Sequence, residues 1–299
     1  MTFEILMPFY GRIDHFKSAV QSILSQDDPN WILTVVDDVY PSLDPGLWLT
    51  GLGDKRITYV RNEENLRPSR NYNKCVTLAK SDFITLMGCD DIMLPGYVSR
   101  VRELLRDFPE ADILQPGVKV ISESGHTVHP LADTVKSAIR PRVRSARQLD
   151  GESLALSLLR GNWTYFPSLV WRTERLGTSG FRTDLDVVQD LAMLMHIVGA
   201  GGKMVIDNEI VFSYRRHATS VSAVTGPDGS KFRQERTLFN ETSVLFEQRG
   251  WSRAARAAKT HFLSRLNALS ELPGAIKTNN VVGKSTLTRH ILGLPYRSL

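Results

Sequence analysis

The chain contains little cysteine and no long apolar run. Two cysteines, Cys75 and Cys89, occur in 299 residues, which excludes a disulfide framework and indicates free thiols in a reducing compartment. No apolar stretch approaches the ~18 residues that are needed to span a bilayer. Residues 1–10 lack the basic segment and the small-residue cleavage site of a secretory signal. We therefore expect a cytoplasmic protein.

Acidic residues are scarce in two segments, although 42% hydrophobic and 23% charged residues are typical of a globular protein. Residues 134–149 hold five Lys or Arg and no acid, and residues 250–299 hold eight against the single Glu271. Basic surfaces of this kind attract phosphates, anionic lipid or nucleic acid, or they are simply solvated. We expect the C-terminal region to make peripheral contact with the inner face of an anionic membrane.

Strand and helix patterns alternate along most of the chain, which predicts βαβ units and an α/β fold with a mostly parallel sheet. Residues 124–150 show no periodicity and predict a long basic loop or insert, and residues from about 231 predict a helical extension. Strands are expected at 3–8, 31–36, 56–60, 83–87, 111–114, 118–121, 168–173, 203–206 and 210–214, and helices at 16–24, 68–80, 95–107, 151–159 and 186–198.

Polar residues follow three of these strands. Asp90 and Asp91 come after Gly88 at the end of the fourth strand, and Asp37 and Asp38 end the second. Pro8, Tyr10 and Arg12 follow the first strand. In an open α/β sheet, ligands bind beyond the carboxyl ends of the strands. Adjacent acids there repel each other unless a cation lies between them, and Mg²⁺ commonly takes one or two carboxylates plus substrate phosphates. The alternative for each pair is a solvated turn.

Six motifs, in this order, resemble those of the family 2 glycosyltransferases, which are inverting enzymes with the GT-A fold. They are M-P-F-Y (7–10), V-D-D (36–38), N-L-R-P-S-R-N (65–71), M-G-C-D-D (87–91), Q-D-L (189–191) and Y-R-R-H-A-T-S (214–220). Each motif is weak alone, but six in the family's order are specific. The resemblance implies a GT-A-type, Rossmann-like catalytic domain over residues 1–222, followed by a helical extension over residues 223–299.

The resemblance also implies a role for each matched position. Asp190 would be the catalytic base, and Asp91, with His217 as a second candidate, would bind a divalent cation, Mn²⁺ or Mg²⁺. Asp38 would accept a hydrogen bond from the nucleobase. The full set of implied donor-binding residues is Pro8, Tyr10, Arg12, Asp38, Asn65, Arg70, Asp90, Arg215 and His217. Trp163 and Tyr165 are predicted to contact the acceptor because aromatic faces stack on sugar rings; core packing is the alternative.

The chemistry of sugar transfer requires these residue types. Breaking the sugar–phosphate bond leaves negative charge on the diphosphate, which a metal ion and basic side chains stabilise. The acceptor hydroxyl becomes nucleophilic when a carboxylate takes its proton. Attack opposite the leaving group inverts the anomeric carbon, so one base is sufficient. We expect a UDP-, dTDP- or GDP-linked donor and a sugar, glycolipid or other hydroxyl acceptor, in polysaccharide or glycolipid biosynthesis.

Three positions depart from the family pattern. Gly88 stands where the family usually has the first acid of Asp-x-Asp, so metal binding must depend on Asp90 and Asp91. Arg67 replaces a usual Gly, and Gln189 replaces a usual Glu. One alternative is a non-catalytic relative. Another is a nucleic-acid-binding protein that uses the basic insert and tail, but this leaves the acid pairs unexplained, so we expect no nucleic-acid partner.

Overall fold

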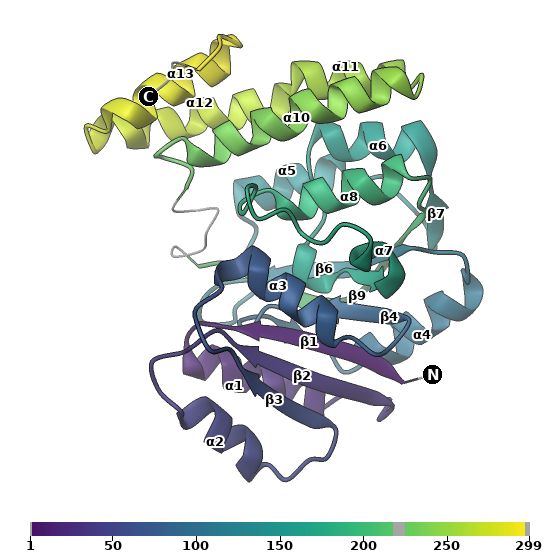
Figure 1. The fold of residues 1–299 in the computed structure, drawn as a ribbon. Coiled ribbons are helices and arrows are strands. Elements are labelled where there is room, and N and C mark those ends of the chain that lie inside the picture. Colours follow the sequence, from purple (N-terminus) through teal and green to yellow (C-terminus); the bar gives the residue numbers. More distant parts are fainter. Residues whose placement is uncertain (1, 218–224, 297–299) are drawn as a thin grey trace.

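The computed structural model describes residues 2–217 and 225–296, and a mixed nine-stranded sheet forms its centre (Figure 1). Its N-terminal part has the order β3-β2-β1-β4, and all neighbours in it are parallel. These strands are β1 (Phe3–Phe9), β2 (Trp31–Asp37), β3 (Ile57–Arg61) and β4 (Phe83–Leu86). Their near-continuous apolar runs are typical of strands that are buried on both faces.

The second part of the sheet contains two long strands where four short ones were predicted. β6 (Ile113–Ile121) pairs in parallel with β9 (Met204–Arg215), and the register shifts around Gly117. A Cβ at Gly117 would lie 2.5 Å from the carbonyl oxygen of Glu209, so this close approach requires glycine. The breaks predicted at 115–117 and 207–209 are therefore an irregularity within two continuous, paired strands. β5 (Ile92–Met93), β7 (Arg147–Leu149) and β8 (Val170–Arg172) pair antiparallel with their neighbours.

Helices cover both faces of the sheet. One apolar cluster joins alternate strand residues to α1 (Ile13–Leu24), α2 (Asp44–Gly51) and α4 (Tyr97–Asp107). The other joins the opposite strand face to α3 (Arg67–Leu78), α6 (Gly151–Arg160) and α8 (Gln189–Gly199), with α7 (Thr173–Gly177) beside them. Neighbouring strand residues divide between the clusters: Ile5 and Met7 belong to the first and Leu6 to the second, as the two-residue period of a strand dictates.

For residues 124–150, predicted to be a loop or an insert, the loop is wrong, and the insert stays a prediction. This segment contains α5 (Leu131–Ile139) as well as β7. Apolar residues do recur at helical spacing here, at Leu131, Val135 and Ile139, but Leu131 and Val135 are exposed and the buried residue of α5 is Asp133. The predicted helix at 186–198 also starts later, at Gln189.

The C-terminal region consists of α10 (Ser230–Gln248), α11 (Ser252–Thr260), α12 (Phe262–Lys277) and α13 (Val281–Leu292). Figure 1 shows α10 and α11 stacked over α6 and α8, with α12 and α13 at the upper left, and all four helices away from β1–β3. Apolar side chains of α10 and α11 belong to the same cluster as α6 and α8, whereas α12 and α13 contribute to a small separate cluster. The domain boundary at 222 stays a prediction and falls outside the described residues. None of the helices the structure describes is long and apolar enough to cross a membrane.

Candidate active site

The polar strand ends meet at one edge of the sheet. Phe9 pairs with Asp37 in the register of β1 and β2, and the backbone N–H of Asp38 donates to the carbonyl of Phe9 at 2.9 Å. Beside them, the N–H of Met87 at the end of β4 donates to the carbonyl of Leu6 at 2.9 Å. The acids that follow β2 and β4 and the loop that follows β1 therefore lie together.

The Y-R-R-H motif at the end of β9 meets the acidic turn after β4. The N–H of Arg215 donates to Oδ1 of Asp91 at 2.8 Å, and its Nε donates to the carbonyl of Asp90 at 2.6 Å. His217 Nε2 lies 2.6 Å from Oδ2 of Asp90. Residues more than 120 positions apart in sequence thus form one cluster. Ala218, Thr219 and Ser220 of this motif lie outside the described residues.

Asp91 is the most unusual group of this cluster. Asp91 is 1% exposed, and no hydrogen-bond donor to its buried Oδ2 is found among residues 2–217 and 225–296. Burial, and then the negative charge of Asp90, raise the pKa of Asp91 well above its ordinary value. The hydrogen bond to Asp90 raises the pKa of His217. An unsatisfied buried carboxylate oxygen is strongly disfavoured unless a cation or donor occupies the space beside it.

The residues present fit a cation that uses few protein ligands. No group of three or more His, Cys, Asp or Glu arranged to hold a metal occurs in 2–217 and 225–296. A cation at Asp91 would therefore complete its coordination with phosphate oxygens and water, as Mg²⁺ commonly does. Gly88 is part of this arrangement, because a Cβ there would lie 2.5 Å from Oδ2 of Asp91 and 2.9 Å from Oδ1 of Asp90. The two carboxylates occupy the space that a side chain at position 88 would need.

Asp38 holds the loop that enters α3. Its buried carboxylate accepts hydrogen bonds from the N–H of Leu66 at 2.7 Å, the N–H of Arg67 at 2.9 Å and Nδ2 of Asn62 at 2.9 Å. Asn65 Nδ2 donates to the Asp38 carbonyl at 3.0 Å. Both oxygens of the carboxylate thus have protein donors, and a direct bond from Asp38 to a nucleobase stays a prediction.

Arg67 has a left-handed backbone conformation, which favours glycine. Its φ is 64°, in the left-handed region where a side chain costs about 1 kcal/mol. The loop after β3 therefore accepts a strained arginine, and Asp38 binds the N–H of this residue.

Asp190 lies in the first turn of α8 and is partly exposed. Asn162 Nδ2 donates to its Oδ2 at 2.8 Å. The preceding Gln189 is buried and accepts a hydrogen bond from Ser69 of α3, so the start of α8 is tied to the helix that Asp38 caps. In the family pattern Glu is usual at 189; here the amide makes this buried contact.

Lys136 of α5 lies within electrostatic range of Asp190, and Tyr214 of β9 lies within electrostatic range of Asp90 and Asp91. Burial and then the positive charge of Arg216 lower the pKa of Lys136 to about 8, and Asp190 and Asp133 oppose this shift. Burial raises the pKa of Tyr214. The positive charge of Arg216 lowers this pKa, and the negative charges of Asp91 and Asp90 raise it further. Both acid groups are thus within electrostatic reach of the cluster formed by Lys136, Tyr214 and Arg216.

The sequence did not reveal the contacts that attach α5 to this cluster. Arg216 donates from Nε and Nη2 to the two oxygens of buried Asp133 at 2.9 and 2.8 Å. The hydroxyl of Tyr165 also donates to Asp133 at 3.1 Å, and the Tyr165 ring lies 5.2 Å from that of Tyr214. Basic composition marked the segment from residue 134 onward, but Asp133 stands one residue before it.

The prediction that Trp163 contacts the acceptor is wrong. Its side chain is 0% exposed, its Nε1 donates to Ser157 at 3.1 Å, and its ring belongs to the core cluster that includes α6 and α8. Core packing, the alternative reading, is correct for this residue. Tyr165 is half-buried against Tyr214 and Lys136, so contact with an acceptor stays a prediction for it.

The remaining predicted donor-binding residues are arranged around the same edge. Tyr10 is exposed, and its ring lies 6.1 Å from that of Tyr40. Arg12 is paired with Asp14 and Glu123, whereas Arg70 is exposed on α3 and Pro8 is partly buried at the end of β1.

The sequence model described as Glycosyl transferase family 2 matches residues 4–161, more than half of the chain. The chain belongs to this family. Its relatives include WcaA of Escherichia coli (strain K12), named for colanic acid biosynthesis, which is 34% identical over 97 residues. That match covers 32% of this chain and 35% of WcaA. The uncharacterized protein MT1568 of Mycobacterium tuberculosis is 26% identical over 231 residues, or 73% of this chain and 67% of the relative.

Two solved structures resemble this family 2 glycosyltransferase over nearly its whole length. TarS 1–349 of Staphylococcus aureus, in complex with UDP-GlcNAc, has a TM-score of 0.63 and 14% identity, covering 99% of this chain and 93% of that one. The mannosyltransferase PcManGT of Pyrobaculum calidifontis, with GDP-Man and Mn²⁺, has a TM-score of 0.61 and 15% identity, covering 96% and 78%. These similarities confirm the predicted GT-A-like α/β fold with a C-terminal helical region.

Proposed function

We propose that this protein is an inverting glycosyltransferase that moves a sugar from a nucleoside-diphosphate donor to an acceptor hydroxyl. The observation that carries the proposal is the cluster of Asp90, Asp91, Arg215 and His217 at the carboxyl edge of the sheet, where one buried oxygen of Asp91 has no donor among the residues that the structure describes. Ligands of open α/β sheets bind at this edge. Family membership supports the same reaction class.

The donor would lie along the edge formed by β1, β2 and β4. The TarS and PcManGT structures contain UDP-GlcNAc and GDP-Man, which supports a nucleotide-sugar donor and leaves UDP, dTDP and GDP to be compared. Tyr10 is 57% exposed, so its ring is available to pack on a nucleobase. Asp38 accepts hydrogen bonds from the N–H groups of Leu66 and Arg67 and so fixes the loop that enters α3 beside this edge.

A divalent cation, Mn²⁺ or Mg²⁺, would be held by Asp91, with Asp90 and His217 nearby, and would supply positive charge to the leaving diphosphate. Arg215 is placed to position these groups: its Nη1 donates to the carbonyls of Ser122 and Glu123 at 3.2 and 2.9 Å. Since its guanidinium is engaged with backbone carbonyls, Arg215 holds the acidic turn in place and leaves His217 to face the donor.

Asp190 would take the proton of the acceptor hydroxyl. Asn162 donates to one carboxylate oxygen and orients it. Within the described ranges Asn162 is the hydrogen-bond partner of this carboxylate, so Oδ1 stays available for an acceptor. One base is sufficient for inversion, because no covalent intermediate has to be formed or broken down.

The test is incubation with a panel of UDP-, dTDP- and GDP-sugars and Mn²⁺ or Mg²⁺, with release of the nucleoside diphosphate as the readout. Asp190→Asn keeps the shape of the side chain and should lower transfer about 10²- to 10⁴-fold while nucleotide binding, measured by thermal shift, stays near that of the wild type. Near-normal turnover of this variant would overturn the assignment of the base. Pyrophosphate in place of nucleoside diphosphate would overturn the reaction class.

A further inference from the structure

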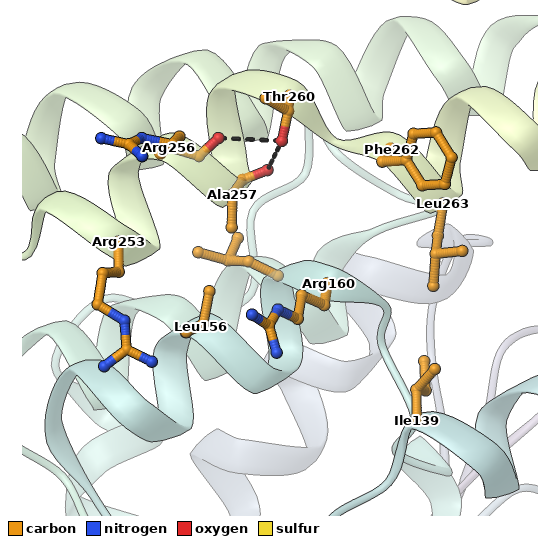
Figure 2. Close-up of a pocket in the computed structure, with 10 residues that line it drawn as sticks. Ile139, Leu156, Arg160, Arg253, Arg256, Ala257, Thr260, Phe262 and Leu263 are labelled. Carbon is orange, nitrogen blue, oxygen red and sulfur yellow. Dashed lines mark hydrogen bonds between the residues drawn. The ribbon is translucent and has the colours of Figure 1, made fainter.

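A cavity of about 530 Å³ lies between α6 and the corner where α11 meets α12, outside the cluster of the candidate site. Figure 2 shows side chains of α6 facing those of α11 and α12 across it. Its walls combine apolar side chains (Leu156, Leu159, Leu263 and Phe262) with three arginines (Arg160, Arg253 and Arg256). A wall that is both cationic and apolar suits a ligand that has an anionic part and an apolar part.

In the described ranges ten arginines pair with a carboxylate, as Arg216 does with Asp133, and the three arginines of the cavity wall are not among them. In the part of the chain that the structure describes, no ion pair or side-chain hydrogen bond is made by the guanidinium of Arg160, Arg253 or Arg256. Arg160, Arg253 and Arg256 are exposed to solvent, where their like charges repel one another weakly. An anion placed between them removes this repulsion, and guanidinium groups match phosphate oxygens in geometry.

The apolar side of the cavity continues onto an exposed face of α12. Phe262, Leu266, Leu269 and Ile276 are between 45% and 65% exposed, and their spacing places them on one face of the helix. Glu271 is the single acid after residue 250, against eight Lys or Arg. An apolar face on a basic helical region is the pattern of helices that lie in the interface of an anionic membrane.

We propose that this cavity binds the phosphate head group and the first part of the hydrocarbon chain of an anionic membrane lipid, while the exposed face of α12 rests in the bilayer surface. Free phosphate would engage the arginines but leave the leucine wall without a partner. A nucleic acid would likewise leave Phe262 and Leu266 in water. An uncharged lipid would leave three arginines unpaired. An anionic lipid satisfies both sets of side chains.

The inner wall of the cavity contacts the segment that positions the candidate base. Gly161 follows Arg160, and a Cβ at Gly161 would lie 2.5 Å from Ile139 and 3.0 Å from Leu263, two residues of the wall. Asn162 is the next residue, and it holds Asp190. If Asp190 is the base, as proposed above, a bound lipid brings it close to acceptors that are embedded in the membrane. Lipid binding itself does not depend on that assignment.

The test is flotation of the full-length protein with phosphatidylcholine vesicles, with and without phosphatidylglycerol. We expect binding to the anionic vesicles. The triple variant Arg160→Ala/Arg253→Ala/Arg256→Ala should bind them on the order of 100-fold more weakly, since each basic residue near an anionic surface contributes about 1 kcal/mol. The matched control, Lys17→Ala/Lys55→Ala/Lys80→Ala, removes the same charge from exposed positions in the first 80 residues and should bind nearly as the wild type.

A second variant, Phe262→Ser/Leu266→Ser, changes exposed apolar residues without changing charge and should also lower vesicle binding severalfold. Asp190→Asn should bind vesicles as the wild type does, so failure of this proposal and failure of the proposed reaction are distinguishable. Equal losses in the arginine and lysine triple variants would overturn the proposal, because general electrostatics would then explain binding. Stabilisation by inorganic phosphate, or retention on RNA, without vesicle binding would overturn it as well.

Discussion

Gly88→Ala tests the arrangement of the acidic turn with the smallest change possible. The added Cβ would lie 2.5 Å from Oδ2 of Asp91, whereas ordinary contacts begin at 3.4 Å, so the oxygen must move by about 0.9 Å. A misplacement of ~1 Å in a catalytic group can cost about 100-fold in rate. We therefore expect transfer to fall about 100-fold, with nucleotide affinity lowered too, because Asp90 is also within 2.9 Å.

The assay is the initial rate of nucleoside diphosphate release, with the melting temperature recorded for each variant. Gly51→Ala is the matched control: a Cβ there meets nothing within 4 Å, and Gly51 lies in α2. This change should leave the rate unaltered and stabilise the helix by up to about 1 kcal/mol. A Gly88→Ala enzyme that keeps at least half of the wild-type rate would refute the role given to the two carboxylates.

Three further predictions concern stability and are checked by urea unfolding. Trp163→Ala should destabilise the protein by about 3–5 kcal/mol, whereas a tryptophan in contact with the acceptor would lower acceptor affinity at little cost in stability. Arg67→Gly should raise the free energy of unfolding by up to about 1 kcal/mol, because it removes strain at φ 64°; a loss would show that the arginine side chain stabilises the loop. Burial, and then the charge of His261, lower the pKa of His290 to about 3. The unfolded state therefore takes up this proton first as the pH falls below about 6.5, and stability should decline by up to about 1.4 kcal/mol per pH unit toward pH 3. His290→Gln should flatten this dependence; an unchanged slope would contradict it.

The fold was predictable because its strands are unusually clear in the sequence. The runs of β1, β2 and β4 are mostly apolar, and acid pairs stand at the ends of β2 and β4, so these runs indicate both the sheet and its ligand edge. The order of the six motifs then indicated the family, and the family model confirms it.

The parts that sequence reasoning missed depend on contacts between distant residues. The helix α5 was not predicted because its buried residue is charged. This residue, Asp133, forms an ion pair with Arg216. Trp163 stands in a polar and aromatic stretch, which suggested that its ring stacks on an acceptor sugar. In the structure it follows α6, and its ring is packed in the apolar core. For Asp38, the sequence indicates an acid at the ligand edge, but not that Leu66 and Arg67 occupy its oxygens.

The shared core of α8, α10 and α11 has a mechanical consequence. Phe239 and Phe246 of α10 and Ala254 of α11 are packed in the same apolar cluster as Leu194 of α8. Tilting the C-terminal helices against α8 would therefore open a close-packed interior. We therefore expect α10 and α11 to move together with α8 as one body, so that a displacement of these C-terminal helices also displaces the carboxylate in the first turn of α8.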